Sequence, residues 1–263
     1  MSETFLQEIL RITRDRVESQ KRGVDLSELR SSALAIRSAA ENHRFRDALS
    51  ANNGVNIIAE IKRASPSKGI INEHIDVAKV AEKYREGGAC AISVLTEEAY
   101  FKGSLDDLRT VRKTVDLPIL RKDFIVDEFQ IYEAAEAGAD AILLIVAALT
   151  AENLKDFQRL VENDLGMDAL VEVHTLEEMQ IAIDIGATII GINNRDLHSF
   201  DVSLDVSRDL IRHRPPNTLM IAESGISSAA EIAELKSLGF DGFLIGETLM
   251  REQEPGAFLR AAK

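Results

Sequence analysis

The sequence predicts an α/β protein whose strand–helix units close into a (β/α)8 barrel, a TIM barrel, behind an N-terminal helical extension. Its 263 residues and 45% apolar side chains suit one large domain, 1–263. Short apolar segments alternate with helical patterns from Val55 onward. Several units share a glycine just before an apolar strand, which is typical of the residue that ends a helix. These glycines are Gly88, Gly138, Gly186 and Gly239.

The extension, residues 1–50, has helical periodicity. Apolar side chains recur at helical spacing in Thr4–Lys21, and Leu26–Ala40 and His43–Leu49 predict two shorter helices. Asn52-Asn53-Gly54 then predicts a turn. We expect the extension to pack on the barrel end that carries the site, where loops need a lid.

Residues 55–263 hold eight βα units. Four strands follow the glycines named above, and the other four are Val55–Ile61, Leu117–Arg121, Ala169–Val173 and Leu219–Ala222. All are short and rich in Ile, Val and Leu, as expected of parallel strands with both faces buried. A doubly wound open sheet is the alternative, but it uses fewer units at this length and usually carries a Gly-rich dinucleotide turn, which the sequence lacks.

Composition narrows the range of partners. The net charge of −13 disfavours a nucleic-acid ligand. The single cysteine, Cys90, allows no internal disulfide and favours a reducing compartment. Charged residues in the first turns predict no secretory signal, and the longest uncharged apolar run, Ala141–Leu149, is too short to cross a bilayer. We therefore expect a soluble cytoplasmic protein, a monomer or at most a weak homo-oligomer.

Charged and polar residues gather at the predicted C-terminal strand ends, where TIM barrels carry their chemistry. Glu60 and Lys62 lie two positions apart, so their side chains point the same way. The ends of other strands add Lys122, Glu172, Asn193, Arg195 and Glu223. So many charges at one mouth cost too much desolvation to be only structural, which predicts a site for an anionic ligand.

Small residues follow the last two strands, at Ser224, Gly225 and Gly246, before Glu247. Loops at this place in such barrels often bind phosphate through backbone amides, although plain tight turns are the alternative. The nearby Lys62 favours phosphate. The five histidines, at 43, 74, 174, 198 and 213, lack metal-binding spacing. No metal or cofactor is expected, and we interpret His174 as a loop residue.

Five motifs resemble the indole-3-glycerol phosphate synthase family, in the family's order and over nearly the whole chain. They are Ile58–Gly69 (IAEIKRASPSKG), Leu120–Phe124, Leu170–His174, Ile190–Leu197 and Ala222–Ile226. The resemblance implies a carboxy-lyase of tryptophan biosynthesis without metal or organic cofactor. Such enzymes close the ring of 1-(2-carboxyphenylamino)-1-deoxyribulose 5-phosphate and release carbon dioxide and water.

The resemblance also implies catalytic roles. Lys122 would be the general acid at the substrate ketone, and Glu172 the general base in the loss of water. We expect Glu172 to face the other side of the ring from Lys122 and burial to raise its pKa toward the working pH. Lys62 would bridge the phosphate end and the reacting centre, while Glu60 would orient the lysines and contact hydroxyls.

Further residues are implied to hold the substrate. Asn193 and Arg195 would position the anthranilate ring and carboxylate, and Glu223 the sugar hydroxyls; Asn193 and Ser224 join the catalytic set. The phosphate would be held mostly by backbone amides of Ser224, Gly225, Gly246 and Glu247, with serine in place of Glu247 in some relatives. The ring pocket would be lined by Phe101, Phe124 and Leu144.

Two rival functions remain open. Phosphoribosylanthranilate isomerase, a smaller barrel, would need a cysteine and an aspartate near strand ends, whereas Cys90 starts its strand. A non-catalytic barrel that binds a sugar phosphate would need no proton-transfer pair such as Lys122 and Glu172. Indole fluorescence after addition of the carboxyphenylamino-deoxyribulose phosphate separates all three.

Overall fold

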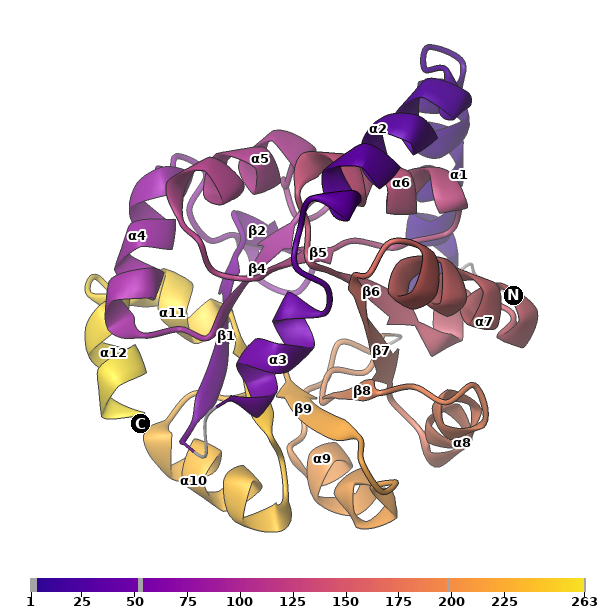
Figure 1. The fold of residues 1–263 in the computed structure, drawn as a ribbon. Helices are drawn as coiled ribbons and strands as arrows, with labels where there is room; N and C mark the ends of the chain where they lie inside the picture. The colour runs from indigo at the N-terminus through magenta and orange to yellow at the C-terminus, as the bar shows by residue number, and fades with distance from the viewer. Residues whose placement is uncertain (1–3, 52–53, 198, 263) are drawn as a thin grey trace.

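A closed barrel of parallel strands forms the centre of the protein (Figure 1). The computed structural model describes residues 4–51, 54–197 and 199–262. Within these residues the strand order around the barrel is β1-β10-β9-β8-β7-β6-β5-β4, which confirms the predicted TIM barrel. The bounds are β1 Asn56–Ile61, β4 Ala91–Leu95, β5 Ile119–Lys122, β6 Ala141–Ile145, β7 Asp168–Val173, β8 Ile189–Asn193, β9 Leu219–Glu223 and β10 Gly242–Ile245.

Helices on the outside cover the barrel (Figure 1). Their bounds are α4 Val77–Gly87, α5 Leu105–Thr114, α6 Glu128–Ala137, α7 Ala151–Arg159, α8 Leu176–Asp184, α9 Asp205–Leu210, α10 Ala229–Leu238, α11 Glu247–Arg251 and α12 Pro255–Ala261. The four glycines predicted to end helices all have positive φ, from 77° at Gly186 to 112° at Gly239. No helix among the described residues is long and apolar enough to cross a membrane.

Three local features differ from a plain alternation of strands and helices. The polar loop predicted after β1 contains a short antiparallel hairpin, in which β2 (Ala64–Ser65) pairs with β3 (Gly69–Ile70). A π-helical turn, Leu160–Asp164, continues α7. The last unit has two short helices, α11 and α12, where one was expected. Asn52 and Asn53 of the predicted turn lie outside the described residues.

The extension forms α1 (Phe5–Lys21), α2 (Leu26–Ser38) and α3 (Arg44–Ser50), as its periodicity predicts. Thr4 caps α1 in a capping box with Gln7. The helix α2 runs along α6, and the two lie side by side in Figure 1. The three helices are thus laid over different parts of the barrel and do not form a separate layer.

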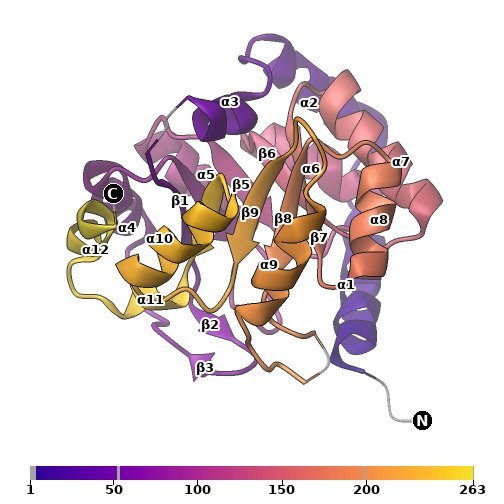
Figure 2. The same ribbon diagram turned by 90° about the horizontal axis from the view of Figure 1, so that it is seen from below.

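Helix α3 lies at the amino end of the barrel, opposite the β2–β3 hairpin (Figure 2). Phe45 and Leu49 are fully buried in the apolar cluster that fills the barrel interior. Asn56, the first residue of β1, donates its side-chain N–H to the Leu49 carbonyl oxygen at 2.8 Å. The expectation that the whole extension covers the site end is therefore wrong, because α3 closes the opposite opening.

Because Phe45 plugs the amino end, Phe45→Ala should lower the free energy of unfolding by about 3–5 kcal/mol, measured by denaturant titration. The kcat of the folded variant should stay near that of the wild type. Phe5→Ala, at the start of α1, is the matched control and should cost less stability, since Phe5 is only half-buried. A loss below about 1 kcal/mol for Phe45→Ala would show that α3 is not a structural plug.

Candidate active site

A cavity of about 680 Å³ opens at the carboxyl ends of the strands. All of the charged and polar residues predicted to gather there line it. They are Glu60, Lys62, Lys122, Glu172, Asn193, Arg195 and Glu223. Because parallel strands all end at one rim, residues more than 160 positions apart in the chain meet in one pocket.

Glu60 and Lys62 form the first acid–base pair of the cavity. Glu60 is the fifth residue of β1 and Lys62 follows the strand. The Lys62 Nζ lies 2.7 Å from the Glu60 Oε1. The prediction that the two side chains point the same way is confirmed, and the period of two along a strand explains it.

Lys122, the last residue of β5, lies between two carboxylates. Its Nζ is 3.1 Å from the Glu172 Oε2 and 3.2 Å from the Glu223 Oε2. Burial on its own lowers the pKa of Lys122, but the negative charges of Glu172 and Glu223 outweigh it and raise the pKa above its usual value. Lys122 is therefore a protonated ammonium group at neutral pH.

The expected rise in the pKa of Glu172 is wrong. Burial raises the pKa of this carboxyl, but the ammonium of Lys122 and further contacts lower it below its usual value. The raised pKa belongs to Glu223, at about 7, because of its burial; Lys122 lowers it less than burial raises it, and Glu172 repels the charge. Glu172 is thus the ionised member of the pair, and Glu223 is the one that titrates near neutral pH.

Glu172 and Lys122 also do not lie on opposite sides of the pocket. Only β6 lies between their strands, and both side chains turn into the cavity and meet. A ring placed between them has to separate the two groups. Their action on opposite sides of the ring stays a prediction.

Two glycines make room for the carboxylates. A Cβ on Gly191 of β8 would lie 2.0 Å from the Glu223 Oε1. A Cβ on Gly246 would lie 2.3 Å from the Glu60 Oε1. Gly246 was predicted for the phosphate loop alone, but any side chain there would also displace Glu60. Gly191 has no polar atom in its side chain and was missed for that reason.

The predicted phosphate residues line the same cavity. Ser224 and Gly225 have φ of 67° and 78°, so the chain turns sharply after β9 in a conformation that non-glycine residues rarely adopt. The Glu247 carboxylate is 3.0 Å from Arg251 and 3.9 Å from Arg195. Its side chain is therefore occupied by cations, which supports contact with phosphate through the backbone.

Arg195, just after β8, reaches the β2–β3 hairpin. Its Nη1 donates to the Ser67 Oγ at 3.0 Å and to the Phe200 carbonyl oxygen at 3.3 Å. These bonds connect the loop after β8 with the β2–β3 hairpin across the mouth of the cavity. The contact of Arg195 with the substrate carboxylate stays a prediction.

The apolar wall of the cavity is only partly as predicted. Phe101 and Phe124 line it, but Leu144 does not. Leu144 lies in the buried layer between barrel and helices, while its neighbours Leu143 and Ile145 line the cavity. The prediction for Leu144 is wrong by one residue, because an all-apolar strand gives no alternation from which its inward face can be read.

Two residues that fix the aromatic wall were missed. Phe5 of α1 lines the cavity and packs its ring against Phe200 at 4.7 Å between centroids. Glu97, after β4, is buried and accepts backbone N–H bonds from Tyr100 and Phe101. The sequence gives no signal for this turn, because a glutamate that accepts backbone N–H bonds cannot be told from one that faces solvent.

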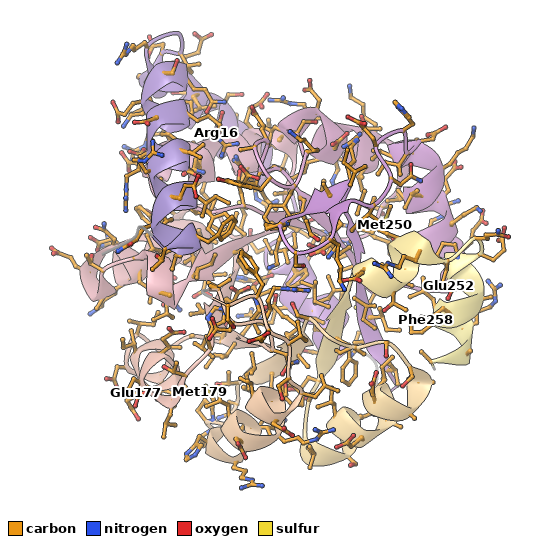
Figure 3. All side chains as sticks on the ribbon, turned by 180° about the vertical axis from the view of Figure 1, so that it is seen from behind. Arg16, Glu177, Met179, Met250, Glu252 and Phe258 are labelled. Atoms are coloured by element: carbon orange, nitrogen blue, oxygen red, sulfur yellow. The ribbon has the colours of Figure 1, made fainter. Side chains whose placement is uncertain are left out.

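Helix α1 is also tied to the strand end that carries Lys122. Figure 3 labels Arg16 on the side of α1 toward the barrel. Its Nη2 donates to both carboxylate oxygens of Asp123, at 3.1 and 3.2 Å. Asp123 in turn accepts from Thr96 and Arg121. The extension thus does reach the site end, through α1 alone.

His174 was interpreted as a loop residue, and it lies beside the catalytic candidates. Its Nε2 is 3.5 Å from the Glu172 Oε1. Among the described residues no group of three or more His, Cys, Asp or Glu could hold a metal ion. His198 lies outside the described residues. Cys90 precedes β4, at the end of the barrel away from the cavity, so the cysteine that the isomerase alternative needs is not in the site.

The fold and the cavity define a TIM-barrel enzyme with a buried acid–base cluster at the strand ends. Among solved structures, a thiamine phosphate pyrophosphorylase from Pyrococcus furiosus matches with a TM-score of 0.59 and 19% identity, covering 83% of this chain and 95% of its own. A 3-hexulose-6-phosphate synthase from Salmonella typhimurium matches with 0.64 and 13%, covering 79% and 96%. At these identities the matches support the fold alone.

Sequence comparison identifies the family. The model of the indole-3-glycerol phosphate synthase family matches residues 6–262. The indole-3-glycerol phosphate synthase of Carboxydothermus hydrogenoformans is 47% identical over 97% of this chain and 98% of its own length. That of Acetivibrio thermocellus is 51% identical over 83% and 84%. The chain belongs to the indole-3-glycerol phosphate synthase family, and it is a carboxy-lyase of that family.

The raised pKa of Glu223 predicts a pH-dependent stability. Its folded-state pKa of about 7 exceeds the ordinary 4.5, so its ionisation costs the folded state free energy as pH rises between these values. Glu223→Gln removes this cost, on the order of 1–3 kcal/mol. Lys122 keeps Glu172 as its partner.

The difference in melting temperature, Glu223→Gln minus wild type, should therefore increase from pH 5 to pH 8 in thermal melts. Glu86→Gln, which neutralises an exposed carboxylate on α4, is the control and should show no such trend. A constant difference across this range would show that Glu223 titrates at an ordinary pKa.

Proposed function

We propose that this cavity is the site where the family reaction takes place on 1-(2-carboxyphenylamino)-1-deoxyribulose 5-phosphate. The observation that carries the assignment is the largely buried ammonium of Lys122, within 3.2 Å of the carboxylates of Glu172 and Glu223. A proton donor and an ionised proton acceptor in one desolvated pocket are what the reaction requires.

Ring closure uses Lys122 as the general acid. The aryl carbon attacks the ketone, and the oxygen gains negative charge, which a proton from the Lys122 ammonium neutralises. Its raised pKa keeps the donor protonated before attack. Loss of the carboxyl group as carbon dioxide then restores the aromatic ring. Lys62, paired with Glu60 beside it, supplies a second positive charge toward the phosphate end.

Loss of water uses Glu172 as the general base. The C–O bond of the hydroxyl formed at the former ketone breaks, and the oxygen takes a proton from solvent and leaves as water. Glu172 takes the proton of the neighbouring carbon in the new ring as the indole double bond forms. The lowered pKa of Glu172 keeps this group ionised and ready to accept. Glu223 and Asn193 hold hydroxyl groups and the anthranilate portion, with Arg195 at its carboxylate and Ser224 at the reacting end.

The phosphate lies beside the loops after β9 and β10 in this proposal. Backbone amides of Gly225, Gly246 and Glu247 hold it, since the Glu247 side chain is engaged by Arg251. The ring rests against Phe101 and Phe124.

One chain carries every residue assigned here, which supports a monomer that acts alone, with a weak homo-oligomer as the alternative. We place the enzyme in the cytoplasm.

Lys122→Met keeps the length of the side chain but removes the proton. General acid catalysis typically supplies about 10²–10⁴-fold, so kcat should fall by at least about 100-fold. KM should change much less in steady-state assays of indole fluorescence. Lys113→Met, an exposed lysine on α5, should behave as the wild type. If Lys122→Met retains more than a tenth of kcat, Lys62 becomes the candidate acid.

Glu172→Gln keeps the size of the side chain but removes the base. We expect a large fall in kcat with little change in KM, and rapid quench should show carbon dioxide released ahead of indole because the earlier stage survives. Glu177→Gln, an exposed neighbour labelled in Figure 3, is the control. Carbon dioxide and indole slowing together without a lag would place Glu172 before or within ring closure.

A further inference from the structure

Glu172 is enclosed on both sides. Lys122 contacts its Oε2, at 3.1 Å, and His174 faces its Oε1, at 3.5 Å. The Glu172 side chain is 1% exposed. A base in this position has to lose, after each turnover, the proton that it has taken from the substrate. Lys122 has given its own proton to the ketone in ring closure and can be recharged from Glu172, whereas His174 is the neighbour on the side that leads toward solvent.

His174 offers the other side. Its Nε2 is buried and has no hydrogen-bond partner among the described residues. The ring is held from behind by Glu178, the third residue of α8, whose Oε2 lies 3.2 Å from the His174 Nδ1. The same oxygen accepts the His174 backbone N–H at 2.7 Å. With a proton on Nδ1, donated to Glu178, the Nε2 lone pair can accept a proton, and it lies 3.5 Å from the Glu172 Oε1.

We propose that His174 is the proton-transfer partner of Glu172 and receives through Nε2 the proton that Glu172 removes from the substrate. The inference rests on the proposed role of Glu172 as the base. The steps balance without a redox change: the C–H bond of the new ring breaks and its electrons form the indole double bond, while the C–O bond at the former ketone carbon breaks and the hydroxyl leaves as water with a proton from solvent. The C–H proton passes to Glu172 and then to Nε2. The imidazolium next releases the Nδ1 proton toward Glu178.

The charges around the imidazole favour this order. Burial lowers the pKa of His174, but the Glu178 hydrogen bond and the charge of Glu172 outweigh it and raise the pKa, with Glu223 adding to the effect. A protonated Glu172 beside a neutral imidazole therefore converts readily to the ion pair. Exposure increases along the row, from 1% at Glu172 to 12% at His174 and 19% at Glu178, so the row leads toward solvent.

His174→Asn and His174→Ala test the proposal. An asparagine amide can still donate to Glu178 but cannot take up a proton, whereas alanine leaves a space. Both variants should lose at least about tenfold in kcat with KM within about twofold, a modest share of what acid–base groups supply. Added imidazole should restore part of kcat in His174→Ala. His213→Asn, on an exposed histidine, is the control.

A double-mutant cycle gives the second readout. In the Glu172→Gln background there is no proton to relay, so His174→Ala should cause no further loss. Additive losses, wild-type activity in His174→Asn, or the absence of rescue by imidazole would overturn the relay and leave His174 a structural residue. An unaffected kcat in Glu172→Gln alone would instead overturn the proposed base, so the two failures are distinguishable.

Discussion

The site depends on one buried cation. Lys122 is the positive charge within 3.2 Å of both Glu172 and Glu223, each of which is 1% exposed. Two carboxylates this deep in a protein repel each other and are poorly solvated, so they need a charge between them to exist ionised. The charge of Lys122, together with further contacts, outweighs the effect of burial on the pKa of Glu172, but it does not do so for Glu223, whose pKa stays at about 7. One ammonium thereby sets two carboxyl groups with different proton affinities in one pocket.

The barrel also has glycine at two positions where a side chain would collide with a carboxylate of the site. Gly191 in β8 and Gly246 after β10 are where a Cβ would collide with the Glu223 and Glu60 carboxylates. Glycine in a strand weakens it, because its backbone is freer in the unfolded chain. At Gly191 this cost falls on β8, which lies beside the strand that carries Glu223. Loss of packing at these two positions is therefore part of the construction of the site.

The charged residues at the strand ends were predicted from the sequence better than the apolar residues that line the cavity. Strand ends are marked by a change from apolar to charged residues, and the barrel topology then places every such end at one rim, so Glu60, Lys122 and Glu223 could be assigned together. Leu144 could not, because its strand is apolar on both faces and either register satisfies the pattern. The direction of the Glu172 pKa shift could not be predicted either, since it depends on the distance of 3.1 Å to Lys122.

The extension shows why local pattern cannot place an amphipathic helix. Both α1 and α3 bury an apolar face in the barrel interior cluster, yet Phe5 enters it from the site end and Phe45 from the amino end. The two helices have the same kind of periodicity, and only their polar partners differ. Arg16 of α1 donates hydrogen bonds to Asp123, beside Lys122, whereas the carbonyl oxygen of Leu49 in α3 accepts one from Asn56. The partner of Arg16 lies 107 positions away in the sequence, and neither pairing becomes visible until the barrel is closed. The extension therefore divides two tasks, since α3 seals the core and α1 braces the strand end that carries the catalytic lysine.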